Sequence, residues 1–241
     1  MNTVKFDKGN RNVKMVAHRG VSGLERENTC SAFVAAGNRS HFGIETDVHV
    51  TKDGKFIIIH DDNTSRVGVD SLHVEETTFQ TLRSLQLLNT DGQRSRADLC
   101  LPSLDEYVGI CKKYEKIGVL ELKNRMTVDN IRGILQVIDD MDYLSGIIFI
   151  SFDIENLYDL RKICPEARAQ WLCCSCEDDL LDNLAAHKLD MDVLHDALTE
   201  ERIKAAHDRG ITVNCWTVDD PKRAEDLTAW GVDMITSNIL E

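Results

Sequence analysis

The sequence contains no apolar run of the roughly 20 residues that a membrane-spanning helix needs. Its first residues, MNTVKFDKGNRNVK, also lack the apolar core of a signal peptide. We therefore expect a soluble, cytoplasmic protein with no stable membrane insertion. Positive charge is scarce as well, since 28 lysines and arginines stand against 41 aspartates and glutamates, a formal net charge of −13. Nucleic acids and anionic membrane surfaces are bound through a positive field, so we expect no nucleic-acid partner, although local cations could hold a small anionic substrate.

No linker, repeat or low-complexity segment divides the 241 residues, a length that suits two small domains or one α/β barrel. Hydrophobic residues make up 42% of the chain, which is enough for a full core. The eight cysteines are scattered through apolar stretches, unlike those of a small disulfide-rich protein. Cys173, Cys174 and Cys176 cluster, but no second ligand pair follows at zinc-site spacing. We therefore interpret the cysteines as mostly buried thiols.

Short β-rich runs alternate with amphipathic helical stretches along the chain. The predicted strands span residues 13–18, 43–49, 55–60, 117–123, 147–151, 168–173, 191–195, 211–216 and 233–236. The predicted helices span residues 29–40, 76–87, 103–116, 127–141, 154–163, 177–187, 199–209 and 221–230. Some helices carry end signals, including a capping box that begins at Ser103 and a first-turn proline at Pro221.

The strand at 55–60 differs from the others because only residues 51–54 connect it to the strand at 43–49. Parallel neighbours need a crossover of about a dozen residues, so this connection predicts a hairpin that turns at Asp53-Gly54. The remaining eight strands alternate with helices, which is the pattern of a closed (β/α)8 TIM barrel. We predict a single TIM-barrel domain over residues 1–241, with the hairpin arm and a small insertion at about 62–102. An open doubly wound sheet fits less well, because no glycine-rich phosphate loop follows the first strand.

Polar residues gather at the carboxyl ends of the predicted strands, where barrels carry their catalytic groups. They are His18, Arg19, Glu45, Asp47, His60, Glu121 and Lys123. Any one of them alone would most often be a solvated or hydrogen-bonded structural residue. Together they place three carboxylates at one mouth, and these repel one another unless a cation neutralises them. Because every ligand is an oxygen, we expect one hard divalent cation, Mg²⁺ or Ca²⁺.

Eight short motifs follow one another along the chain. They are His18-Arg19-Gly20, Glu27-Asn28-Thr29, Glu45-Thr46-Asp47-Val48, Thr51-Lys52-Asp53-Gly54, His60-Asp61, Glu121-Leu122-Lys123, Trp216-Thr217-Val218 and Gly231-Val232-Asp233-Met234-Ile235-Thr236. In this order they resemble the glycerophosphodiester phosphodiesterase family over residues 15–238, nearly the whole chain. The resemblance implies a phospholipase C-like phosphodiesterase barrel that hydrolyses a glycerophosphodiester to glycerol 3-phosphate and an alcohol.

The resemblance also implies roles for the reacting groups. Glu45, Asp47 and Glu121 would be the metal ligands, and His18 and His60 would be the general acid and base. Which histidine acts as the acid, and whether a cyclic phosphate forms, stays open at this point.

Four further residues complete the expected site. Arg19 and Lys123 would hold the phosphate oxygens, on which negative charge builds in the transition state. Trp216 could form an apolar wall for the substrate, although a core position suits a tryptophan equally well. Glu27 is expected to orient a neighbouring residue rather than to bind the metal.

Two positions depart from the family pattern, in which proline is usual. Arg26 precedes the Glu27-Asn28-Thr29 motif, where it could add a cation near the mouth, and Asn238 follows the last strand. We expect the second change to matter only for the closing turn. Phe152 and His195 follow strand ends and could line the pocket. Two other histidines are expected outside it, His49 at the rim and His41 at the surface.

Two alternatives stay open beside the glycerophosphodiester substrate. A lysophospholipase D-like lipid phosphodiesterase would need an exposed apolar rim, and residues 67–99 are not notably apolar. A catalytically idle phosphodiester-binding barrel is the other, and the intact histidines and carboxylates argue against it. The leaving alcohol, the ion and the oligomeric state are left undecided by the sequence.

Overall fold

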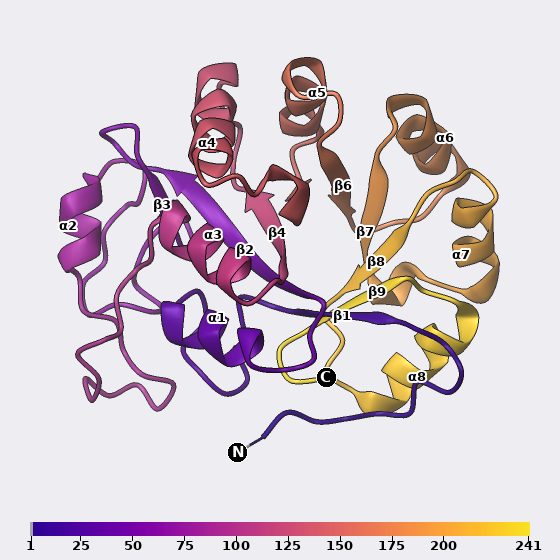
Figure 1. Ribbon diagram of the computed structural model, residues 1–241, viewed down its shortest axis with the longest axis horizontal. Coiled ribbons are helices and arrows are strands. Elements are labelled where there is room, and N and C mark those ends of the chain that lie inside the picture. The colour runs from indigo at the N-terminus through magenta and orange to yellow at the C-terminus, as the bar shows by residue number, and fades with distance from the viewer. Residues whose placement is uncertain (1) are drawn as a thin grey trace.

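A computed structural model describes residues 2–241 of the chain. Eight parallel strands form a ring, and helices surround it (Figure 1). The barrel strands are β1 (Lys14–Ala17), β2 (Gly43–Val50), β4 (Ile117–Leu122), β5 (Ile147–Ser151), β6 (Arg168–Cys173), β7 (Asp190–Leu194), β8 (Val213–Trp216) and β9 (Met234–Ser237). Parallel pairing of β1 with both β2 and β9 closes the ring. The predicted TIM barrel is therefore confirmed.

The predicted hairpin arm is β3 (Phe56–Ile58), which pairs antiparallel with the end of β2. Its turn contains Gly54 at φ +72°, in the left-handed region that glycine adopts without strain. Beyond the strand, the amide of Ile59 donates to the carbonyl oxygen of Asp47 at 3.1 Å. This bond holds the next residue, His60, beside the carboxyl end of β2.

All eight predicted helices are confirmed within residues 2–241, with somewhat different ends. They are α1 (Cys30–Gly37), α2 (Phe79–Ser84), α3 (Leu104–Lys113), α4 (Val128–Asp140), α5 (Ile154–Ile163), α6 (Asp178–His187), α7 (Glu200–His207) and α8 (Pro221–Trp230). Two short 3-10 helices, η1 (Leu144–Gly146) and η2 (His195–Ala197), precede β5 and follow β7. The capping box is present, since the Ser103 amide donates to the Glu106 carboxylate at 2.9 Å. No helix in this described part is both long and apolar enough to cross a bilayer.

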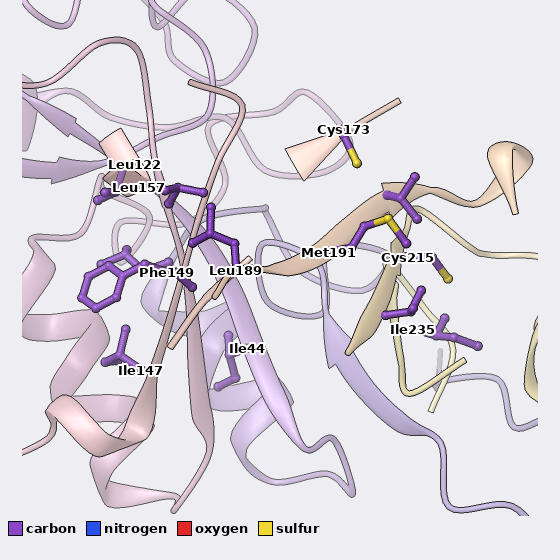
Figure 2. Close-up of a cluster of buried hydrophobic side chains, with 14 of the residues drawn as sticks. Ile44, Leu122, Ile147, Phe149, Leu157, Cys173, Leu189, Met191, Cys215 and Ile235 are labelled. Atoms are coloured by element: carbon purple, nitrogen blue, oxygen red, sulfur yellow. The ribbon is translucent and has the colours of Figure 1, made fainter. Parts of the chain in front are cut away.

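Alternating side chains on β2 and β4 separate the core from the barrel interior. Ile44, Val48 and Leu122 are at most 1% exposed and belong to the large apolar cluster between strands and helices (Figure 2 labels Ile44 and Leu122). Complete burial of one large aliphatic side chain stabilises a fold by roughly 1.5–3 kcal/mol. This packing fixes the face that each strand turns outward, so the residues between, Glu45 and Glu121 among them, point into the barrel.

The segment between β3 and α3, which includes the expected insertion, forms a second small core. Ile57 and Ile59 from the hairpin arm pack there against apolar residues such as Leu82, Leu87 and Leu101. The segment carries α2 and lies to one side of the helix ring (Figure 1). The hairpin that carries His60 is therefore clamped between two apolar clusters.

Two histidines are more deeply buried than expected. His49, predicted at the rim, is 0% exposed, because it shares the inward face of β2 and its ring contacts the carbonyl oxygen of His60 at 3.3 Å. His41, predicted at the surface, is 2% exposed, and its Nε2 lies 3.1 Å from the carbonyl oxygen of Leu240. Among the clustered cysteines, Cys174 alone is exposed.

Candidate active site

A cavity of about 110 Å³ opens at the carboxyl ends of the barrel strands. It is lined by His18, Arg19, Glu45, His60, Glu121, Ile150, Phe152, Leu172, Asp192, Trp216, Thr217 and Thr236. Six of these are predicted site residues. The other three, Glu27, Asp47 and Lys123, each contact a lining residue with a charged group. The structure therefore brings the whole predicted set together.

Three carboxylates from two adjacent strands meet at this cavity, two of them lining it and the third, Asp47, beside them. One oxygen from each of Glu45, Asp47 and Glu121 lies within 4.8 Å of the others. The parallel register of β2 and β4 places Asp47 directly beside Glu121. All three side chains are buried, with exposures between 1% and 6%.

The three carboxylates do not ionise alike. Burial, together with the charge of Asp47, raises the pKa of Glu45 well above its ordinary value and raises the pKa of Glu121 to about 8. Burial alone would also raise the pKa of Asp47, but Arg19 and Lys123 hold it far below its usual range. Without a further cation, negative charge is therefore most favoured on Asp47, and Glu121 is mostly protonated at neutral pH. Asp47 Oδ1 has no hydrogen-bond partner within residues 2–241.

Two cations stand beside the carboxylates. The Arg19 backbone amide donates to Glu45 Oε2 at 2.8 Å, and its guanidinium Nε lies 3.6 Å from Asp47 Oδ2. Lys123 Nζ lies 2.9 Å from Glu121 Oε1. Burial alone would lower the pKa of Lys123, but Asp47 and Glu121 raise it, so the ammonium stays charged at neutral pH.

Glu27 holds the Arg19 guanidinium through a different nitrogen from the one that lies beside Asp47. Its Oε1 accepts a hydrogen bond from the Arg19 guanidinium at 2.8 Å, and Arg66 binds the same carboxylate. Glu27 is not among the residues whose oxygens converge on one point. The orienting role of Glu27 stays a prediction, and its contact with Arg19 is the one through which it would act.

His18 is oriented by a residue that the sequence interpretation assigned only to the closing turn. Its Nδ1 lies 2.7 Å from Asn238 Oδ1, while Asn238 Nδ2 donates to Asp219 Oδ2 at 2.6 Å. Because a carboxylate only accepts, the Asn238 amide must turn its oxygen toward His18. His18 Nδ1 then donates, which leaves Nε2, 3.9 Å from Glu45 Oε2, without its proton. The expectation for Asn238 was wrong because β9 lies beside β1 and brings the two side chains together.

His60 is oriented by a carboxylate instead. Its Nδ1 lies 2.6 Å from Asp61 Oδ1, and Arg66 donates to the other Asp61 oxygen at 2.7 Å. Burial lowers the pKa of both His18 and His60. Both rings are therefore mostly neutral at neutral pH, and each is held through Nδ1.

An aromatic wall faces the carboxylates across the cavity. Trp216 and Phe152 meet edge to face, with their ring centroids 5.6 Å apart. Trp216 Nε1 donates to the backbone oxygen of Asp192 at 3.2 Å. His195 does not line the cavity, and its ring contacts Arg223 instead.

Several site residues were missed by the sequence interpretation. Asn28 donates to Asp47 Oδ2 at 2.7 Å, and Asp192 lines the cavity from β7. The signal for Asp192 was available, because a carboxyl group inside the predicted strand at 191–195 is unusual unless it faces the barrel interior. Arg26 does not supply a cation to the mouth, since its guanidinium donates to the backbone oxygens of Leu88 and Asn89.

Comparisons with known proteins agree with this geometry. A glycerophosphodiester phosphodiesterase of Caldanaerobacter subterraneus subsp. tengcongensis is 24% identical over 227 residues, 93% of each chain. The structure of an Oleispira antarctica phosphodiesterase in complex with its product sn-glycerol-3-phosphate matches with a TM-score of 0.87 at 22% identity, covering 94% of this chain and 93% of that one. A glycerophosphodiester phosphodiesterase structure from Parabacteroides distasonis matches with a TM-score of 0.80 at 28% identity, covering 95% and 94%. The model of the glycerophosphoryl diester phosphodiesterase family matches residues 18–240, and the chain belongs to this family.

Proposed function

We propose that the protein hydrolyses glycerophosphodiesters to glycerol 3-phosphate and an alcohol, with one divalent cation and two histidines as general acid and base. The observation that carries this proposal is the convergence of Glu45, Asp47 and Glu121 in the cavity that His18 and His60 also line. Family membership supports the reaction class.

The carboxylate cluster fits a bound cation. Three carboxylate oxygens within 4.8 Å of one another form an oxygen-only donor set of the kind that Mg²⁺ and Ca²⁺ prefer. Asp47, one of the three residues, also has an oxygen, Oδ1, without a hydrogen-bond partner within residues 2–241. Burial, together with the negative charge of Asp47, raises the pKa of Glu45 and Glu121, and Arg19 and Lys123 do not fully offset this rise. When bound by Glu45, Asp47 and Glu121, the cation would polarise a phosphate oxygen as a Lewis acid.

Arg19 and Lys123 supply fixed positive charge for the phosphate. Arg19 lines the cavity, and its Nε has no hydrogen-bond partner within residues 2–241. Preorganised cations of this kind stabilise the charge that builds on phosphoryl oxygens in the transition state.

The two histidines differ in the partner of Nδ1, and this difference assigns their roles. The neutral Asn238 amide leaves His18 Nε2 free to accept a proton, from water or from the neighbouring glycerol hydroxyl, which makes His18 the general base. The Asp61 carboxylate favours the imidazolium form of His60 and so opposes the effect of burial, which makes the protonated fraction of His60 the acid that protonates the leaving alcohol. A water-soluble substrate is favoured over a lipid, because Phe152 is the one large exposed hydrophobic side chain among the described residues that line the mouth.

The test is hydrolysis of glycerophosphodiesters by the parent, with and without a chelator, and by His18→Ala and His60→Ala. We expect the chelator and each substitution to lower kcat by about 10²- to 10⁴-fold. His73→Ala, at an exposed position outside the cavity, is the matched control and should keep parental activity. Activity that ignores both the chelator and the substitutions would overturn the mechanism, and a parent without activity would point to a phosphodiester-binding barrel.

A further inference from the structure

Asp192 is a buried carboxyl group whose position the proposed reaction does not explain. It lies on β7, on the opposite side of the ring from β2, which carries Glu45 and Asp47. Its side chain is 1% exposed and lines the cavity, and Oδ1 has no hydrogen-bond partner within residues 2–241. A buried polar atom without a partner destabilises a fold. When such an atom faces a cavity, a ligand group is the natural partner.

Within residues 2–241 a hydrogen bond with Asn214, and no cation, opposes the effect of burial on the pKa of Asp192. Gln170, Asn214 and Thr236 form the neighbouring polar layer of the barrel, all at most 2% exposed and joined by hydrogen bonds of 3.3 and 3.5 Å. The cations of the cavity stand instead beside the carboxylates of β2 and β4. Burial accordingly raises the pKa of Asp192 to about 8. At neutral pH the carboxyl group is mostly protonated, so it offers one hydrogen-bond donor and one acceptor. A hydroxyl group offers the matching pair.

We propose that Asp192 hydrogen-bonds a hydroxyl group of the glycerol moiety and thereby selects glycerol phosphates over other phosphate esters. This inference rests on the proposed function and names the residue that recognises the glycerol part of the substrate. Glycerol is common to every substrate of this class, whereas the leaving alcohol varies. An enclosed residue such as Asp192 suits the constant part, and Phe152, which is 49% exposed at the opening, suits the variable part.

Competitive inhibition by three phosphates tests the proposal. Glycerol 3-phosphate carries two hydroxyl groups, n-propyl phosphate is its counterpart without them, and inorganic phosphate has no carbon chain. For Asp192→Leu we expect the inhibition constant of glycerol 3-phosphate to rise about 10-fold or more, the usual effect of losing a hydrogen bond in a buried site. The constants for n-propyl phosphate and inorganic phosphate should change less than about twofold. Asp192→Asn keeps a donor and an acceptor and should retain most of the preference.

Controls separate selectivity from folding and from the proposed function. Because leucine removes a buried polar atom that lacks a partner, thermal unfolding of Asp192→Leu should occur at or above the parental temperature, and Asp192→Ala replaces it if leucine does not fit. A uniform rise in all three inhibition constants would overturn the proposal. Phosphorylcholine, which carries a cationic alcohol, serves as a further inhibitor. If it alone inhibited both the leucine and asparagine variants less than the parent, Asp192 would bind the cationic leaving alcohol and the proposal would again be overturned. Failure of the proposed function looks different, since the parent itself would then hydrolyse no glycerophosphodiester.

Discussion

Replacing Glu121 with glutamine should stabilise the metal-free protein while it weakens cation binding. The pKa of Glu121 is raised from 4.5 to about 8, so at neutral pH the folded protein holds a proton that the unfolded chain has lost. Each pH unit above 4.5 then costs the folded state about 1.4 kcal/mol, which amounts to about 3 kcal/mol at pH 7. The penalty is absent below pH 4.5 and stops growing above pH 8. Glutamine at position 121 abolishes this pH-dependent penalty. It also weakens the contact with Lys123, and that loss cancels about 1 kcal/mol of the gain in stability.

The assay is urea unfolding of the parent and Glu121→Gln with a chelator present, at pH 5 and pH 7. The substitution should raise the free energy of unfolding by roughly 2 kcal/mol at pH 7 and have almost no effect at pH 5. Adding Mg²⁺ or Ca²⁺ should then stabilise the parent much more than the variant. A variant that is less stable than the parent by the same amount at both pH values would refute the reasoning, because it would mean that Lys123 keeps Glu121 ionised.

Two further predictions concern the cation and His18. Binding of Mg²⁺ or Ca²⁺ should displace protons from Glu45 and Glu121, so the affinity for the cation should rise with pH. Between pH 6 and pH 8 we expect a rise of about tenfold per pH unit for each displaced proton, measured by calorimetry. Equal affinities at the two pH values would show that both carboxylates are ionised before the cation binds. Asn238→Leu should lower kcat by about 10- to 100-fold with little change in KM, because His18 loses the oxygen that orients its ring. Ser22→Ala removes another hydrogen bond to the same Asn238 oxygen and should keep most of the activity, so equal losses would contradict a role in orienting His18.

Local rules were sufficient to predict the barrel and the carboxylate cluster. Period-two alternation places Ile44 and Val48 on one face of β2 and Glu45 and Asp47 on the other, whatever the strand packs against. The four-residue connection at 51–54 permits only an antiparallel arm, which leaves eight strands for the ring. Both predictions depend on residues that are close in sequence, and the structure confirms both.

Contacts that depend on barrel closure could not be predicted in the same way. Asn238 and His18 are 220 positions apart, and they meet because Ser237 of β9 is paired with Ala17 of β1. That register is set by the packing of all eight strands, so no local pattern reports it. His49 shows the same limit, because its inward-facing ring is covered by contacts with the carbonyl oxygen of His60 and with Glu75, both outside β2.

The barrel interior concentrates groups that cost stability, and the outer shell offsets that cost. Glu121 and Asp192 are both buried carboxyl groups with raised pKa values, and they lie on different strands of one cavity. Replacing either ionisable group with a neutral one should therefore strengthen the fold and weaken one recognition step, which is cation binding at Glu121 and recognition of the glycerol hydroxyl at Asp192. A structural role predicts the opposite sign, since replacing a structural carboxyl group destabilises the protein. The sign of the stability change thus separates functional from structural carboxyl groups in this barrel, independently of any measurement of turnover.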